Sequence, residues 1–217
     1  MKLRTKHILA GIVAVSLTAA ALPGLAATAE HSCTRIVGYS TTVQWTRVLE
    51  PHVLNAEWEF QAAGSQSIEA WGPEDPAWDE VPVSSPCGET TRAIIQVATM
   101  TRKSDDAARQ AIAEAIAGIR AHVPTASEIA LVPVNGGPFG SVCTVFVNGT
   151  LKSVYSSVIY PQMVRLIGEV RGDNVTTPFN EFTVGSCSHY RDAKGHVTLT
   201  GATYLARTFK SVIVDGS

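Results

Sequence analysis

The chain has 217 residues, of which 45% are hydrophobic and 17% are charged, and its formal net charge is −2 at pH 7. A chain of this length and composition can bury the core of one globular domain. Its charge balance is mildly acidic and it has no cluster of basic residues, which excludes nucleic acid as the main partner.

The first 29 residues have the pattern of a secretory signal peptide. Basic residues come first, an apolar run covers 8–22, and Ala27-Thr28-Ala29 offers a cleavage site after Ala29. A membrane anchor is the poorer interpretation, because the run falls short of the ~20 residues that span a bilayer. We therefore expect a secreted or periplasmic domain over 30–217, with no membrane span in its mature form.

Further along the chain, strand-like and helix-like hydrophobic patterns alternate. Strands are expected over 34–40, 56–63, 92–99 and 128–134, and a fifth within 175–184. Helices are expected over 41–50, from Ser104 to near Pro124, over 151–169 and over 198–214. Between them, 65–86 forms a long loop and 141–147 is ambiguous. The alternation predicts an α/β domain whose parallel sheet is covered by helices on both faces.

A carboxylate and an imidazole near the C-terminus are the first candidate catalytic groups. Asp192 precedes His196 by four residues, and a carboxylate can orient a histidine that acts as a general base. Both residues follow the last expected strand, at the carboxyl edge where open parallel sheets bind ligands. The first strand ends at the same edge with Gly38-Tyr39-Ser40. Ser40 is therefore the candidate nucleophile, although a serine before a helix is also a common N-cap.

The order of these motifs resembles the SGNH (GDSL-type) hydrolase family over nearly the whole mature chain. Gly38-Tyr39-Ser40 is similar to its first block, Gly-Asp-Ser, and Gly64 matches the glycine of its second block. Asp192 to His196, followed by Val-Thr-Leu-Thr-Gly, is similar to its last block. The resemblance implies a flavodoxin-like three-layer sandwich with a five-stranded parallel sheet in the order 2-1-3-4-5.

The resemblance also implies an activity and a set of roles. Ser40 would attack a carboxylic ester, His196 would be the base, and Asp192 would orient His196. The backbone N–H groups of Ser40 and Gly64 would form the oxyanion hole. No metal or organic cofactor is implied.

Two features depart from the family pattern. The place of the third block, Gly-x-Asn-Asp, reads Ala98-Thr-Met-Thr-Arg102, so the expected Asn is missing, and Thr99 or Thr101 would have to supply a hydroxyl instead. Losing one oxyanion donor typically costs about 10²–10³ in rate. The Asp-to-His spacing is also one residue too long, an excess that Gly195 could absorb. An α/β-hydrolase is rejected, because its serine lies in a mid-chain Gly-x-Ser-x-Gly.

Four cysteines remain after cleavage, and an even number in an exported protein favours two disulfides. No Cys-x-x-Cys spacing supports a zinc site. In the expected strand order, Cys33 and Cys87 precede neighbouring strands, whereas Cys143 and Cys187 follow neighbouring strands. A bridge between the two edges would exceed the ~7 Å limit between Cα atoms. We therefore predict Cys33–Cys87 and Cys143–Cys187.

Two functional hypotheses remain open. The first is a monomeric secreted esterase that acts on a small-molecule ester, either an acylated sugar or a lipid. The second is a non-catalytic exported domain that keeps the fold and binds a ligand at the altered site. In the long loop, Trp71 and Trp78 would either line the substrate cleft or pin the loop to the core.

Overall fold

The computed structural model describes residues 31–53, 57–64, 66–179 and 181–215. The expected signal peptide and its cleavage site at Ala29 lie outside these residues. Within them, no helix combines the length and the apolar character needed to cross a bilayer.

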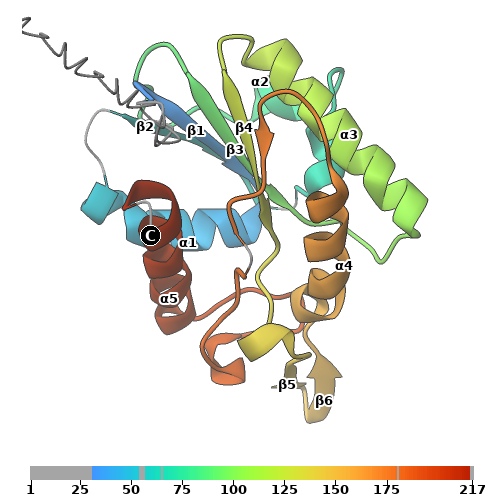
Figure 1. Ribbon diagram of the computed structural model, residues 1–217. Coiled ribbons are helices and arrows are strands. Elements are labelled where there is room, and N and C mark those ends of the chain that lie inside the picture. The colour runs from blue at the N-terminus through green and yellow to red at the C-terminus, as the bar shows by residue number, and fades with distance from the viewer. Residues whose placement is uncertain (1–30, 54–56, 65, 180, 216–217) are drawn as a thin grey trace, which may run out of the picture. The chain divides into compact units, whose positions relative to one another are not determined.

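A five-stranded parallel sheet forms the centre of the fold (Figure 1). Its strands are β1 (Thr34–Gly38), β2 (Trp58–Ala62), β3 (Arg92–Val97), β4 (Glu128–Pro133) and β7 (Val175–Thr176). They are arranged in the order β2-β1-β3-β4-β7, which confirms the predicted α/β fold and strand order. The central strands are short, rich in Ile and Val and buried on both faces, as strands between two helical layers must be.

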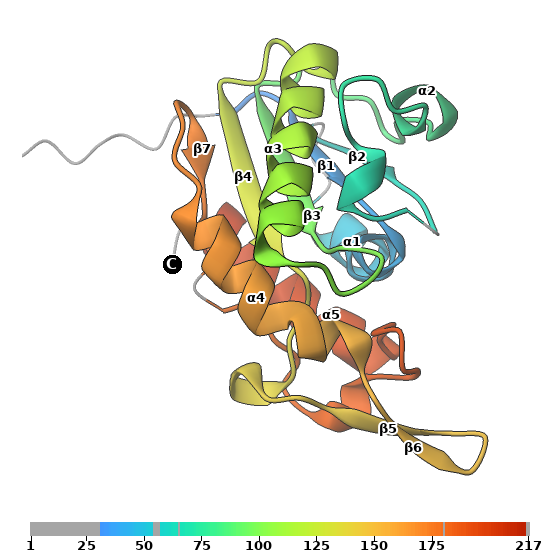
Figure 2. The same ribbon diagram turned by 90° about the vertical axis from the view of Figure 1, so that its right-hand side faces the viewer.

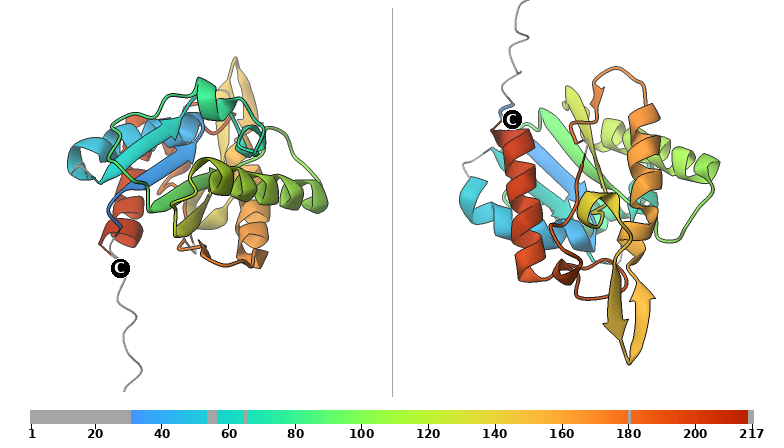
Figure 3. Two further views of the ribbon diagram at one scale, coloured as in Figure 1. Left: turned by 90° about the horizontal axis from the view of Figure 1, so that it is seen from above. Right: turned by 60° about the horizontal axis from the view of Figure 1, so that its bottom comes forward.

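Helices cover both faces of the sheet. On one face, α3 (Asp105–His122) and α4 (Tyr155–Glu169) pack on the side chains of Val37, Ile95 and Leu131. On the other face, α1 (Ser40–Val53) and α5 (Leu199–Phe209) pack on the alternate positions, among them Ile36 and Ile94. Figure 3 shows α5 and α4 on opposite sides of the strands. The two helical layers and the sheet form the predicted three-layer sandwich.

The segment expected to be a helix over 151–169 is different at its start. β5 (Thr144–Val147) and β6 (Thr150–Ser153) form an antiparallel hairpin, and α4 begins only at Tyr155. Asn148 and Gly149, which join the two strands, both have positive φ. An Asn-Gly pair favours this two-residue hairpin turn, and that local signal outweighs the helical spacing of the apolar residues after it.

Three element boundaries also differ from the prediction. Pro51 does not close the first helix, since α1 continues to Val53. The fifth parallel strand is reduced to two residues, and Thr183 forms a further parallel bridge to Gly136. The last helix keeps α-helical geometry to Phe209 and continues as a π-helix over Lys210–Val214.

The long loop contains two short helices, Ile68–Ala70 and α2 (Ala77–Glu80). Trp71 and Trp78 are buried and make an edge-to-face contact with ring centroids 4.9 Å apart. Trp78 also stacks on His122 of α3, and its Nε1–H donates to the carbonyl of Gly72. These tryptophans therefore pin the loop to the core and do not line a cleft.

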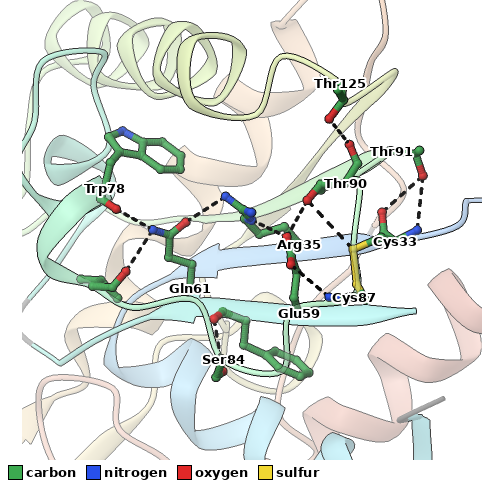
Figure 4. Close-up of polar contacts among 12 residues, drawn as sticks. Cys33, Arg35, Glu59, Gln61, Trp78, Ser84, Cys87, Thr90, Thr91 and Thr125 are labelled. Atoms are coloured by element: carbon green, nitrogen blue, oxygen red, sulfur yellow. Dashed lines mark hydrogen bonds and ion pairs between the residues drawn. A yellow bond between two sulfur atoms is a disulfide. The ribbon is translucent and has the colours of Figure 1, made fainter. Parts of the chain in front are cut away.

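A buried polar network fastens this loop to the sheet (Figure 4). Gln61 of β2 donates from its side-chain amide to the carbonyls of Trp78 and Val81. Beside it, the Glu59 carboxylate accepts from Arg35 Nε at 2.6 Å and from the Thr90 hydroxyl at 2.5 Å. The network thus connects β1 and β2 with the middle of the connection to β3 and with its end.

Both predicted disulfides are present. Cys33 is joined to Cys87 near the amino edge of the sheet, and Cys143 is joined to Cys187 near the carboxyl edge. The described residues contain no free cysteine.

Candidate active site

Ser40 lies at the carboxyl end of β1, as the first residue of α1. The first turns of this helix are held by Gln96 of β3. Its buried Oε1 accepts hydrogen bonds from the Thr42 hydroxyl at 2.7 Å and from Trp45 Nε1 at 3.2 Å. Gly38 is required here, because a Cβ at this position would lie 2.1 Å from Thr42 Oγ1. The helix therefore begins directly at the sheet edge and holds Ser40 there.

The structure brings Ser40, His196 and Asp192 into one hydrogen-bonded row. His196 Nε2 lies 2.8 Å from Ser40 Oγ, and His196 Nδ1 lies 2.6 Å from Asp192 Oδ2. The second carboxylate oxygen of Asp192 accepts the backbone N–H groups of Lys194 and His196. These are the contacts that a nucleophile, a general base and an orienting carboxylate require.

The electrostatics of Asp192 favour its charged form. Burial alone would raise the pKa of this carboxyl, but hydrogen bonds and the charge of the His196 ring, together with the two backbone N–H groups, outweigh burial. The net result is a pKa below the ordinary Asp value, so the carboxylate is available to stabilise an imidazolium.

Gly195 explains how the longer Asp-to-His spacing still permits contact. Its φ is +106°, a conformation that side chains other than glycine rarely adopt. It also packs so closely on α4 that a Cβ would lie 2.3 Å from Ser156 Oγ. The extra residue is therefore accommodated in a turn that brings His196 back to Asp192.

Four hydrogen bonds hold the catalytic loop, defined here as residues 190–197, in place. Asn135 Nδ2 donates to the Gly195 carbonyl at 3.2 Å, and the Tyr190 hydroxyl donates to the Asn135 carbonyl at 2.9 Å. The Tyr155 N–H donates to the Ala193 carbonyl at 2.8 Å, and the Val197 N–H donates to Gln44 Oε1 at 2.9 Å.

Asn135 and Gln44 are not among the site residues predicted from the sequence. The one available signal was the position of Asn135, directly after a buried strand at the carboxyl edge.

The oxyanion-hole candidates come from the ends of three neighbouring strands. Ser40 contributes the N–H at the start of α1, Gly64 follows β2, and Thr99 follows β3. Thr99 is buried and its hydroxyl has no hydrogen-bond partner among the described residues, whereas Thr101 is exposed. The phenol oxygens of Tyr39 and Tyr155 are likewise buried without a hydrogen-bond partner in this part of the chain.

Burial raises the pKa of the Tyr39 phenol and outweighs the opposite influence of the Thr41 side chain, while the phenols of Tyr190 and Tyr155 raise it further. These hydroxyls are therefore neutral donors at physiological pH.

An open hollow of about 420 Å³ lies where the loops after β2 and β3 meet. Its lining includes Gln66, Glu69, Met100 and Lys103. The two loops are joined by the Ile68 N–H, which donates to the Ala98 carbonyl, and by an ion pair of Lys103 with Glu69 at 3.3 Å. Most of its lining side chains are polar or charged.

One cluster of metal-ligand type occurs among the described residues, formed by Cys33, Glu59 and Cys87. Both sulfur atoms belong to the disulfide, and Glu59 is already bonded to Arg35 and Thr90, so the cluster has no thiolate to offer a metal.

Comparison with models of known protein families and with curated proteins finds no match for this chain.

Proposed function

We propose that the protein is a serine hydrolase of the SGNH type that cleaves carboxylic esters. The observation that carries the proposal is the unbroken row from Ser40 Oγ through the His196 ring to Asp192, with contacts of 2.8 and 2.6 Å. The position of the three residues in the fold adds support. The serine follows β1, the Asp-His loop precedes the last helix, and the strand order is the one the SGNH resemblance implies.

In the proposed reaction, His196 Nε2 takes the proton of Ser40 as Oγ attacks the ester carbonyl carbon. The resulting oxyanion is held by the N–H groups of Ser40 and Gly64, with the Thr99 hydroxyl in place of the missing Asn. His196 then gives its proton to the departing alcohol, which leaves an acyl group on Ser40. Water, activated by the same His196, releases the acid and restores the serine.

The proposal includes an extracytoplasmic location and a small-molecule ester, either an acylated sugar or a lipid. Two disulfides fit an oxidising compartment. The polar hollow beside Met100 suits a hydrophilic alcohol portion of the ester.

The test compares hydrolysis of short p-nitrophenyl esters by the wild type, Ser40→Ala and His196→Ala. Each variant should lose about 10³-fold or more in kcat, since removal of either member disables the pair. Ser127→Ala is the matched control, because Ser127 is an exposed serine just before β4 whose hydroxyl donates to the Thr91 carbonyl. A fluorophosphonate should also label the wild type once, on the peptide that contains Ser40.

A second candidate function is a non-catalytic domain that binds an ester-like ligand at this edge. The missing third-block Asn and the burial of the Thr99 hydroxyl favour it. Equal hydrolysis rates for wild type and Ser40→Ala, with no fluorophosphonate labelling, would decide for this candidate.

A further inference from the structure

Large apolar side chains are exposed at the carboxyl end of the sheet. Phe146 and Leu151 are register partners across the β5–β6 hairpin, and they are 74% and 60% exposed. Phe139, just before the hairpin, is 95% exposed and has a φ of +54°. A bulky residue rarely adopts this conformation, so the backbone bears a cost while the ring is presented to solvent.

The hairpin extends past the end of the sheet and away from the helical layers (Figures 1 and 2). Its base is joined to the catalytic loop through the Tyr155 N–H, which donates to the Ala193 carbonyl, and the Cys143–Cys187 disulfide ties it to the segment just before that loop. Leu199, at the start of α5 three residues after His196, is 76% exposed at the same end. The exposed apolar residues therefore lie on the hairpin, on the segment just before it and at the start of α5, and both the hairpin base and α5 adjoin the catalytic loop.

The charges in this region are predominantly positive. Residues 134–155 contain no Asp or Glu, and their one charged side chain is Lys152. On the attached catalytic loop, Arg191 and Lys194 are exposed, and the single carboxylate, Asp192, is bonded to His196. This contrasts with the net charge of −2 for the whole chain.

We propose that this end of the molecule docks on an anionic lipid surface. The side chains of Phe139, Phe146 and Leu151 would enter the boundary between headgroups and acyl chains, while Lys152, Arg191 and Lys194 would face anionic headgroups. A second copy of the chain fits less well, because a two-fold contact through the hairpins would place like charges against one another. If the esterase proposal is correct, the surface presents lipid esters to Ser40.

Vesicle co-sedimentation tests the docking, and the Ser40→Ala protein is used so that binding is independent of catalysis. Vesicles of phosphatidylcholine alone are compared with vesicles that contain phosphatidylglycerol at one part in four. Binding should be stronger to the anionic vesicles. The double variant Phe146→Ser/Leu151→Ser should bind them at least about tenfold more weakly, because it loses two apolar side chains that would be buried. Lys152→Glu should reduce the preference for anionic vesicles several-fold.

Val214→Ser is the matched control, since Val214 is an exposed apolar residue at the far end of the last helix. It should bind as the parent does, and thermal melting should show that every variant is folded.

Equal binding by the Phe146→Ser/Leu151→Ser variant, or equal binding to neutral vesicles, would overturn the proposal. So would a dimer in sedimentation equilibrium that this variant dissociates. Hydrolysis of soluble esters by the otherwise wild-type chain is measured separately, so a failure of the esterase proposal is distinguished from a failure of docking.

Discussion

At the scale of single residues, the Asp192 carboxylate is held by the backbone as much as by His196. Asp192 uses one oxygen for the His196 ring and the other for two backbone N–H groups. The carboxylate therefore has one orientation before any substrate arrives. Preorganisation of this kind removes reorganisation cost from the reaction.

Asp192→Asn should lower kcat by about 10²–10⁴ with little change in KM, because an amide cannot stabilise the imidazolium as a carboxylate does. Steady-state kinetics on a short p-nitrophenyl ester measure the effect. A kcat within threefold of wild type would mean that His196 works without this carboxylate.

The loss of stability in Asp192→Asn relative to the wild type should depend on pH. The pKa of Asp192 is lowered in the folded state, so its charged contacts stabilise the fold above the unfolded Asp pKa of about 3.9, and that stabilisation is lost as the pH falls through the lower folded value. The difference in melting temperature between wild type and Asp192→Asn should therefore be largest near neutral pH and shrink below about pH 4. A pH-independent difference would contradict the assignment.

The sequence was sufficient to select Ser40, Asp192 and His196, because their positions relative to strand ends are readable from the hydrophobic pattern. The sequence was not sufficient to show that Asn135 and Gln44 hold the catalytic loop. Asn135 holds the carbonyl of Gly195, sixty residues away, and Gln44 holds the N–H of Val197. Such side-chain contacts to distant backbone atoms leave no local pattern.

At the scale of elements, the two disulfides close loops of similar size but hold different parts of the fold. Cys33–Cys87 spans 54 residues, and Cys143–Cys187 spans 44. Only the second connects to the segment that contains the catalytic loop. Removing each disulfide in turn therefore separates an effect on the stability of the fold from an effect on the position of the catalytic loop.

Replacing either cysteine pair by alanines should cost about 4 kcal/mol of unfolding free energy by loop entropy. The Cys143→Ala/Cys187→Ala protein should in addition lose activity, whereas Cys33→Ala/Cys87→Ala should retain its kcat in conditions where it is folded. Urea unfolding and ester hydrolysis measure the two effects. Equal kcat values in both proteins would show that the second bridge does not position the loop.

The hairpin shows why one element was wrongly predicted. Apolar residues from Leu151 onward have helical spacing, and they include Val154, Val158 and Ile159. Spacing alone does not show where a helix begins. The Asn148-Gly149 pair indicates that the helix begins only after a hairpin, because both residues adopt positive φ and reverse the direction of the chain.

At the scale of the whole molecule, the amino half of the sheet carries a buried ion pair far along the strands from the candidate site. Arg35 and Glu59 are direct partners in the β1–β2 register, and Glu59 is almost fully buried (Figure 4). Both are the second residue of their strand, whereas Ser40 follows the end of β1. The pair therefore affects the fold and not the chemistry.

Arg35→Met should destabilise the fold by about 3–5 kcal/mol, because it leaves the Glu59 carboxylate buried without its cation. The double variant Arg35→Met/Glu59→Met should recover a large part of that loss, and kcat should be unchanged in both. Urea unfolding with a double-mutant cycle gives the coupling. If the two single losses simply add in the double variant, the pair is not coupled.

The fold class could be predicted from the alternation of strand-like and helix-like patterns, and the strand order is the one that the SGNH resemblance implies. Both disulfide pairings follow from that order and from the distance that a bridge can span. The extent of the last strand could not be predicted. Pro178 follows Val175–Thr176 closely and lacks the N–H that a continued ladder needs. How many residues before Pro178 pair with β4 depends on the packing of the whole sheet, which the sequence pattern does not show.

Ser40 and His196 are 156 positions apart in the chain. During synthesis Ser40 therefore leaves the ribosome well before His196 does, and the β1–α1 unit on its own contains a serine with no imidazole beside it. If the esterase proposal is correct, an unfinished chain cannot attack esters in its surroundings, because the row of contacts forms only when the loop that carries His196 docks beside α1.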